Sequence, residues 1–391
     1  MFLIEFYAEN HYASIISFIF TFDFARSGNV LSLNLARAYQ RGEKFRVSVN
    51  YRGNPQDGGF GAFTFNTHNG APIIASLSEP YYARLWWPCK DTPVDKADSV
   101  QIDLTVPDNL TAVSNGKLES VRSLSGWKTF SWKTRYPITT YLVSVAVSNY
   151  AEFGETFTFL DGTRMPLVHY VYPERLGDAQ FQLADTPDML EFFNRAFGDY
   201  PFKKEKYGHA QFAWGGGMEH QTITSLGGFS DGLVSHELAH QWFGDLITMK
   251  SWQDIWLNEG FASYGEALFV EDRFDKAAYR NYMSRMDHPY SGSVFVRDTT
   301  SVGSIFNTTV YHKGAWVLHT LRHVIGDATF FSCCAATSLI RVIALAAPRP
   351  MISKISRNKF PARSLAGFSS NGCIAKGVRS CFTDGNKRAR N

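Results

Sequence analysis

The sequence has little cysteine, and what it has is unevenly placed. Only five of the 391 residues are cysteine, and four of these, Cys333, Cys334, Cys373 and Cys381, lie in the last sixty positions. Cys89 alone remains for the rest of the chain. A framework of disulfides needs paired cysteines, so it is excluded as the device that holds the first 331 residues together. A packed apolar core must do so instead, and 45% hydrophobic residues can supply one.

Long hydrophobic runs are missing as well. No window reaches about eighteen uninterrupted apolar residues, and the stretch 335–347 is broken by Arg341. The segment 1–6 has no basic region, and Glu5 and Glu9 interrupt its apolar run, which argues against a secretory signal. We therefore expect no membrane span. The compartment stays unknown, with the cytoplasm as the default.

Acidic residues are almost absent from the end of the chain. Residues 332–391 contain 11 Lys or Arg and one acid, Asp384, whereas the remaining residues hold 28 basic and 35 acidic side chains. The total charge of +3 therefore averages a mildly acidic body and a strongly basic tail. A basic tail can bind nucleic acid or a membrane surface. The alternative is a segment whose composition was never selected for folding.

Short runs of β-branched and aromatic residues, separated by turn residues, fill the first part of the chain. Segments 45–51 and 100–106 alternate apolar and polar side chains, which is typical of half-buried antiparallel strands. Segments 126–131 and 139–147 continue this pattern. We predict a β-sandwich-like N-terminal domain over residues 1–155.

Beyond this domain the hydrophobic period changes to that of a helix. Segment 185–197 places its large apolar residues on one face, and 235–248, 257–270 and 311–324 are also helical in pattern. We predict that the second domain, over 156–331, is mainly α-helical.

The most informative segment is His236-Glu237-Leu238-Ala239-His240. Histidines at positions i and i+4 lie one above the other on a helix, so both imidazoles can reach one metal ion. Glu237 can then address the ion's open position. Ser235 is a reasonable helix cap. With only three fixed letters the motif also occurs by chance, and the alternative is an exposed helix face with two ordinary histidines.

A third ligand decides between these alternatives. Zinc in hydrolytic sites takes three protein ligands and leaves a fourth position for water. Glu259 lies nineteen positions after His240, at the start of the next predicted helix. This spacing allows one helix to end, the chain to turn, and an antiparallel helix to return a carboxylate to the ion. We therefore predict one zinc ion held by His236, His240 and Glu259, with Glu237 as the base that takes a proton from the attacking water.

Four motifs together resemble the aminopeptidase N family of zinc metallopeptidases, the gluzincin group that includes the leukotriene hydrolase. They are His236 to His240 with Glu259, Gly216-Gly217-Met218-Glu219, Tyr311, and the string from Glu79 to Pro93 with Asp95-Lys96-Ala97. The likeness runs from about 39 to 330. It implies a sandwich domain followed by a thermolysin-like α+β catalytic domain. It also implies that the chain is incomplete at both ends.

The resemblance assigns further roles. It implies that Tyr311 stabilises the oxyanion through its phenol, and that Glu79 supplies a second carboxylate from the sandwich domain. Glu219 is the candidate for binding the free α-ammonium of a peptide, because a carboxylate in a partly dry cleft discriminates a charged amine from a neutral amide. Gly216 and Gly217 would let the substrate backbone approach, and Met218 would line the side-chain pocket.

Two features depart from the family. The glycine-rich motif usually continues with Asn, where this chain has His220, and we expect the cleft backbone to survive the change. The likeness also fades after Phe331. Because 332–391 shows no helical phasing and matches nothing in the family, we propose an out-of-frame or spurious translation for it. No nucleic-acid partner is therefore expected.

We therefore interpret the chain as a zinc aminopeptidase that acts on peptides with a free N-terminus. One alternative keeps the metal and changes the bond: an endopeptidase or epoxide hydrolase on the same fold. The other is a non-catalytic fragment that binds zinc or peptide weakly. The preferred N-terminal residue and the oligomeric state are not given by the sequence.

Overall fold

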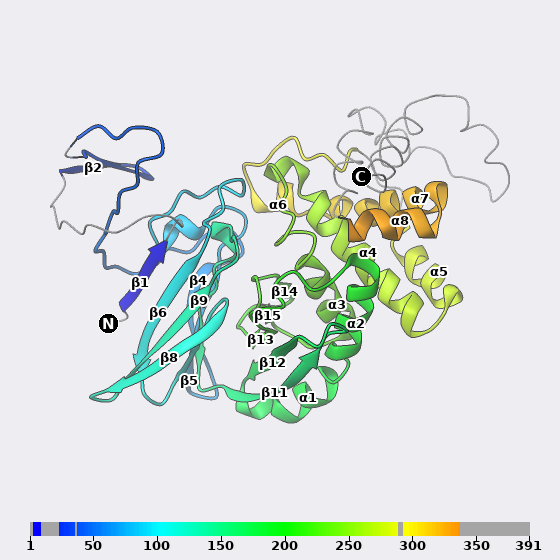
Figure 1. Cartoon of the computed structure of the whole chain (residues 1–391), viewed down its shortest axis with the longest axis horizontal. Helices are drawn as coiled ribbons and strands as arrows, with labels where there is room; N and C mark the ends of the chain where they lie inside the picture. The colour runs from blue at the N-terminus through cyan, green and yellow to red at the C-terminus, as the bar shows by residue number, and fades with distance from the viewer. Residues whose placement is uncertain (1–2, 9–22, 36, 288–291, 337–391) are drawn as a thin grey trace.

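The structure is a computed structural model that describes residues 3–8, 23–35, 37–287 and 292–336 (Figure 1). Two antiparallel four-stranded sheets, one helical unit and a mixed five-stranded sheet make up most of it. Within the described ranges, no helix combines the length and the apolar character needed to cross a bilayer. The greater part of the predicted tail, 337–391, lies outside the described residues.

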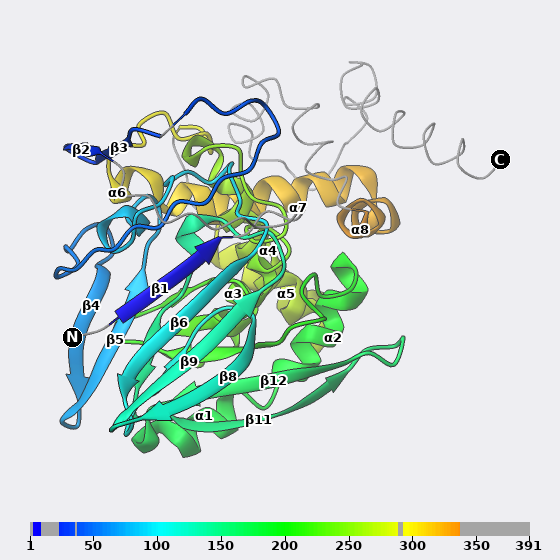
Figure 2. The same cartoon turned by 60° about the vertical axis from the view of Figure 1, so that its left-hand side comes forward.

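The N-terminal part is a sandwich of two sheets, as predicted (Figure 2). The first sheet has the order β1-β6-β9-β8, and the second has the order β4-β5-β10-β7. Their strands are β1 (Leu3–Ala8), β4 (Ala62–His68), β5 (Ala71–Leu77), β6 (Val100–Pro107), β7 (Thr111–Val113), β8 (Lys117–Leu124), β9 (Trp127–Thr134) and β10 (Ala146–Ser148). In β6 buried and half-buried residues alternate, so the period of two in the sequence marks one face turned to the core.

A buried tryptophan joins the two sheets. Trp132 of β9 donates its indole N–H to the carbonyl oxygen of Ala112 in β7, at 2.9 Å. The strand predicted over 45–51 is wrong, because this segment is irregular and Phe45 is 54% exposed. Alternation stabilises a strand only where a partner strand and a core face exist, and 45–51 pairs with no described strand. The remaining hairpin is β2 (Phe24–Ser27) with β3 (Val30–Leu33).

The second part of the chain begins with a sheet of order β11-β12-β13-β15-β14. Its strands are β11 (Ala151–Thr158), β12 (Arg164–Val171), β13 (Tyr207–Gln211), β14 (Gly217–Met218) and β15 (Thr224–Leu226). The inner pairs β12·β13 and β13·β15 are parallel, and the outer pairs are antiparallel. Since β11 starts at Ala151, this sheet includes residues before the predicted boundary at 155.

Helices pack beside this sheet and complete the second part (Figure 1). They are α1 (Leu176–Gln182), α2 (Thr186–Phe197), α3 (Asp231–His240), α4 (Trp256–Arg273), α5 (Lys276–Arg285), α6 (Val302–Ile305), α7 (Gly314–Ile325) and α8 (Asp327–Ala335), with a π-helical turn, η5 (Thr309–Lys313), before α7. The predicted helix over 235–248 is wrong at both ends. It begins at Asp231 and ends at His240. It cannot continue to 248, because Gly244 takes φ +143, a backbone conformation that a helix does not contain.

The end of the described chain differs from the prediction. Residues 332–335, expected to lack helical phasing, continue helix α8. Cys333 and Cys334 are buried there, at 9% and 1% exposure. The apolar face that begins before Phe331 is therefore carried on by these two thiols.

Candidate functional site

The candidate metal ligands come from two packed helices. His236 and His240 lie on α3, and Glu259 lies in the first turn of α4. The helices approach closely because Gly265 of α4 faces Ala239 of α3: a Cβ on Gly265 would lie 2.8 Å from the Ala239 side chain. The absence of a side chain at this crossing thus brings the two helices close enough to share one site.

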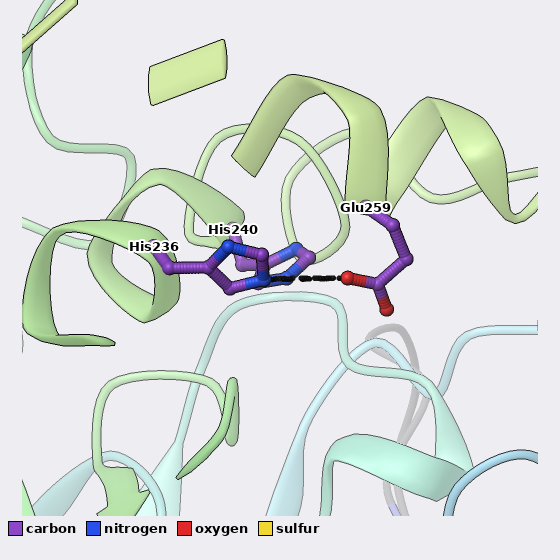
Figure 3. A group of neighbouring side chains, drawn as sticks. All are labelled: His236, His240 and Glu259. Atoms are coloured by element: carbon purple, nitrogen blue, oxygen red, sulfur yellow. Dashed lines mark hydrogen bonds and ion pairs between the residues drawn. The ribbon is translucent and has the colours of Figure 1, made fainter. Parts of the chain in front are cut away.

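The three side chains converge, as Figure 3 shows. The Nε2 atoms of His236 and His240 are 3.1 Å apart, and they lie 3.3 and 3.4 Å from one carboxylate oxygen of Glu259. Tetrahedral zinc with bonds of about 2.0–2.1 Å separates its ligand atoms by about 3.3 Å. The triangle therefore has the size that a single tetrahedral zinc ion requires.

The other ring nitrogen of each histidine is also held. Nδ1 of His236 lies 2.6 Å from Oε1 of Glu266, and Nδ1 of His240 lies 3.1 Å from the carbonyl oxygen of Phe243. Such partners accept a hydrogen bond from the Nδ1–H group, which keeps the proton on Nδ1 and leaves Nε2 free to bind metal. Glu266 is itself held by the hydroxyl of Tyr282, which donates to its second oxygen. Glu266 was not predicted from the sequence, although its position two turns after Glu259 places both on one face of α4.

Charges of opposite sign stabilise each other at this centre. Burial would raise the pKa of Glu259, but the facing imidazoles of His240 and His236 lower it to about 2. Burial would lower the pKa of His240, but Glu219 and Glu259 raise it to about 9. Positive charge is thus favoured between these groups, which is the electrostatic requirement of a cation site.

Glu237 lies beside this triangle. It is 5% exposed, and its Oε2 has no hydrogen-bond partner among the described residues. Burial raises its pKa to about 8, against the lowering effect of the two histidines. Glu219, Glu237 and His240 each offer a ligand atom within 4.8 Å of the others. Glu237 is therefore a buried carboxylate in reach of the metal position.

The glycine-rich segment shapes the space around Glu237. A Cβ on Gly217 would lie 2.5 Å from Oε1 of Glu237, so only glycine leaves room for that carboxylate. Gly216 takes φ +79 and is exposed, while Met218 is 2% exposed. Gly217 and Met218 form β14, the edge strand of the five-stranded sheet, which pairs with β15 alone in the described part of the chain. Its other side faces no described strand.

Glu219 and Glu79 bring two more carboxylates to the site. They are 3% and 4% exposed, and Oε1 of each has no partner among the described residues. Burial, and then Glu219, raises the pKa of Glu79 well above its ordinary value. The sandwich domain thus contributes Glu79 to the same acidic cluster as Glu219 of the catalytic part.

Tyr311 lies on the π-helical turn η5, where we predicted the start of an ordinary helix. Its ring stacks on that of His236, with centroids 6.1 Å apart and an interplanar angle of 24°. Burial, and then Glu259, raises the pKa of its phenol well above 10. The hydroxyl therefore stays protonated and can donate a hydrogen bond.

His220, the departure noted in the sequence, is not in either group of possible metal ligands among the described residues. It is fully buried, its Nδ1 lies 2.8 Å from the hydroxyl oxygen of Ser225, and its backbone N–H donates to the carbonyl of Met218. Burial lowers its pKa to about 3, so the ring is neutral. The backbone from Met218 to His220 keeps a compact turn.

Two residues of the sandwich domain support the site and were not predicted. Lys96 donates to the backbone carbonyls of Asp245 and Leu246, just beyond α3. The hydroxyl of Tyr141 accepts a hydrogen bond from the amide of Asn258, the neighbour of Glu259. The string around Lys96 was noted for its family likeness, and its contact with the segment that follows α3 was not predicted.

Comparison with protein families matches both parts of the chain. Residues 4–142 match the Peptidase M1 N-terminal domain, and residues 230–337 match the Peptidase family M1 domain. The chain belongs to the M1 peptidase family. The predicted resemblance is confirmed, and so is the fold class of a sandwich followed by a helical catalytic domain. The M1 match runs six residues past 331, where we expected the likeness to fade.

Known M1 relatives extend the comparison. Endoplasmic reticulum aminopeptidase 1 of Mus musculus is 29% identical over 332 residues, which is 77% of this chain and 35% of that protein. Aminopeptidase N of Haemonchus contortus is 32% identical, over 69% of this chain and 31% of that protein. The chain thus spans about a third of the length of these curated relatives.

Among solved structures, an M1 zinc metallopeptidase from Deinococcus radiodurans superposes with a TM-score of 0.72 and 26% sequence identity. The match covers 88% of this chain and 83% of that one. Zinc is the metal that this M1 family implies. The donor set of two imidazoles and one carboxylate in this chain agrees with that metal.

Proposed function

We propose that this M1 chain is a zinc-dependent aminopeptidase, which removes the N-terminal residue from peptides. The observation that carries the proposal is the buried acidic cluster of Glu79 and Glu219 beside the His236–His240–Glu259 triangle. A buried carboxylate without a partner is costly. A substrate ammonium in this position would satisfy both acids, and it would fix the first peptide bond next to the metal position.

One zinc ion is proposed, held by His236, His240 and Glu259. When bound, zinc acts as a Lewis acid and lowers the pKa of water to about 7. Glu266 and the Phe243 carbonyl hold the two imidazole rings in the orientation that points Nε2 inward. His236, His240 and Glu259 together supply three protein ligands and leave room for a fourth.

Glu237 is the proposed general base and acid. Its carboxylate takes the proton of the attacking water and returns it to the leaving amine. Tyr311 donates its phenol hydrogen to the oxygen that gains negative charge, and such a prepositioned donor stabilises the transition state.

The substrate backbone is proposed to lie along β14. Gly216 and Gly217 leave space for it, the free edge of the strand can pair with it, and Met218 lines the pocket for its first side chain. A related M1 metallopeptidase from Deinococcus radiodurans, 25% identical with a TM-score of 0.71, has been solved with a Tyr-Ser-Ala substrate. A short peptide is therefore a reasonable substrate class for this chain.

The test is hydrolysis of a panel of aminoacyl anilides, together with the zinc content of the purified chain. We expect one zinc per chain and turnover that Glu237→Gln reduces at least about a hundredfold. A folded, zinc-loaded chain without turnover would instead favour a non-catalytic zinc-binding protein. The cytoplasm stays a default prediction for location. Relatives named for the endoplasmic reticulum make cell fractionation the measurement that decides it.

A further inference from the structure

A cavity of about 460 Å³ opens beside the candidate metal centre, on the side of Tyr311. His236, Tyr311 and Glu266 of α4 are among the residues that line it. Tyr282 and Arg285, from the last turn of α5, line it as well. A volume of this size can hold one or two amino-acid residues of a ligand.

Contacts connect several residues that line this cavity. His236 is bonded to Glu266, Glu266 accepts from Tyr282, and Tyr282 precedes Arg285 by three residues on α5. Positions i and i+3 of a helix are neighbours on one face. Since His236 and Arg285 line one cavity, a molecule bound at the metal position can extend through it toward the guanidinium of Arg285.

The charges of the cavity differ from those of the ammonium site. Among the lining residues Glu266 is the only acid, and both of its oxygens are already engaged, one by His236 and one by Tyr282. Arg285 is exposed, and no described carboxylate pairs with it. Among the described residues, the cavity thus offers a cation that no acid compensates.

None of the buried acids Glu79, Glu219 and Glu237 is among the residues that line this cavity. A peptide carries its positive charge at the N-terminus and its negative charge at the C-terminus. Because the acids lie outside the cavity and Arg285 lines it, the two groups suit a short peptide in one direction only. An exposed arginine alone would mean little, but Arg285 shares a cavity with His236 and Tyr311.

We propose that this cavity takes the residues that follow the cleaved bond, and that Arg285 binds a carboxylate of that part of the substrate. The proposal rests on the aminopeptidase function proposed above. The carboxylate is either the C-terminus of a short peptide or the side chain of an acidic second residue. A guanidinium binds either one through charge-assisted hydrogen bonds.

The first experiment compares kcat/KM for peptides with a free C-terminal carboxylate and for the same peptides amidated, at lengths of two, three and four residues. In the wild-type chain we expect kcat/KM to be about tenfold higher for the free acid than for the amide at one of these three lengths, and Arg285→Gln to remove this preference. Arg280→Gln, another exposed arginine of α5 that does not line the cavity, keeps it. The proposal is overturned if Arg285→Gln changes neither this preference for a free C-terminus nor the preference for an acidic second residue, which the second arm measures.

The second arm separates the two sources of carboxylate. Amidated tripeptides with Glu or Gln at the second position differ only in that side chain. A preference for Glu that Arg285→Gln abolishes assigns the site to an acidic residue, whereas a preference confined to free C-termini assigns it to the chain end.

A binding measurement keeps this inference distinct from the function on which it rests. Calorimetric titration of the metal-free chain with the free and amidated tripeptides needs no turnover. Anilides carry no carboxylate, so their hydrolysis by the wild-type chain tests the aminopeptidase function alone. If anilides are not cleaved while the tripeptide acid binds about tenfold more tightly than the amide only when Arg285 is present, the cavity is supported and the function is not.

Discussion

The imidazole of His236 holds its Nδ1 atom 2.6 Å from Oε1 of Glu266, two turns along α4 from Glu259. One helix therefore supplies both a candidate ligand and the group that orients another ligand. Tyr282 donates to the second oxygen of Glu266, so α5 also contributes to the orientation. This network links three helices to a single ring.

Replacing Glu266 should weaken zinc binding without removing a ligand. In Glu266→Gln the amide oxygen accepts a weaker hydrogen bond from Nδ1–H of His236, so the imidazole ring of His236 loses basicity. We expect zinc affinity to fall by about 10- to 100-fold, measured by competition with a chelator. Tyr282→Phe, which removes only the outer hydrogen bond, should have a smaller effect. Equal zinc affinities in Glu266→Gln and the wild-type chain would show that Glu266 does not orient His236.

The close contact between Gly217 and Glu237 makes a second prediction. An alanine Cβ at 217 would lie 2.5 Å from Oε1 of Glu237 and must displace that side chain. We expect kcat to fall by about 100-fold in Gly217→Ala, since general acid–base catalysis depends on this carboxylate, while zinc content is unchanged. Gly215→Ala is the matched control, because nothing lies within 4 Å of its Cβ position. Similar kcat values in both variants would contradict the assignment.

The buried carboxylate of Glu219 makes a third prediction, about the substrate terminus. Glu219→Gln keeps the shape but removes the charge that would pair with an α-ammonium. We expect the preference for a free aminoacyl anilide over its N-acetyl form to fall by about 10- to 100-fold in kcat/KM. Glu191→Gln, on the exposed face of α2, should leave the preference unchanged. An endopeptidase or epoxide hydrolase would show no such preference in any of these chains.

The sequence was sufficient for the parts of the fold that depend on local pattern. The period of two in β6 and the helical phasing of α2 predicted their elements because each buries one regular face. Segment 45–51 has the same alternation as β6, yet it lacks a partner strand, and pairing between distant segments cannot be read from one sequence. The end of α3 depended on the conformation of Gly244, which the helical pattern through 248 concealed.

The candidate site was predictable where spacing on a helix defines geometry. His236, His240 and Glu259 meet at the expected point because i, i+4 positions share a face and the next helix returns. Glu266 could have been found by the same reasoning along α4. Lys96 could not, because its contacts with the backbone carbonyls of Asp245 and Leu246 join residues about 150 positions apart in different domains.

The last prediction concerns stability and Lys206, a buried amine where the two parts of the chain meet. Its Nζ donates to the carbonyl oxygen of Ser114 at 2.9 Å and lies 4.9 Å from the ring centre of Trp132. Burial lowers its pKa from an ordinary 10.5 to about 7, and the neighbouring Glu205 offsets only part of this shift.

The sign of the pH dependence follows from proton counts. Between about pH 7 and 10.5 the unfolded chain holds a proton on Lys206 that the folded chain does not, so this residue makes stability rise with pH over that window. Below pH 7 both states are protonated and the contribution is constant. We expect the free energy of unfolding of the wild-type chain, minus that of Lys206→Met, to rise by up to about 1.4 kcal/mol per pH unit within the window.

Urea unfolding of both chains at pH 6, 7, 8 and 9 measures this difference. Loss of the bond to Ser114 shifts the methionine variant by the same amount at every pH, and other groups that titrate alike in both chains cancel from the difference. The slope therefore reports Lys206 alone. A difference that stays flat from pH 7 to 9 would mean that the amine is protonated in the folded chain throughout. The ring of Trp132 and the Ser114 carbonyl would then stabilise the cation enough to offset its burial.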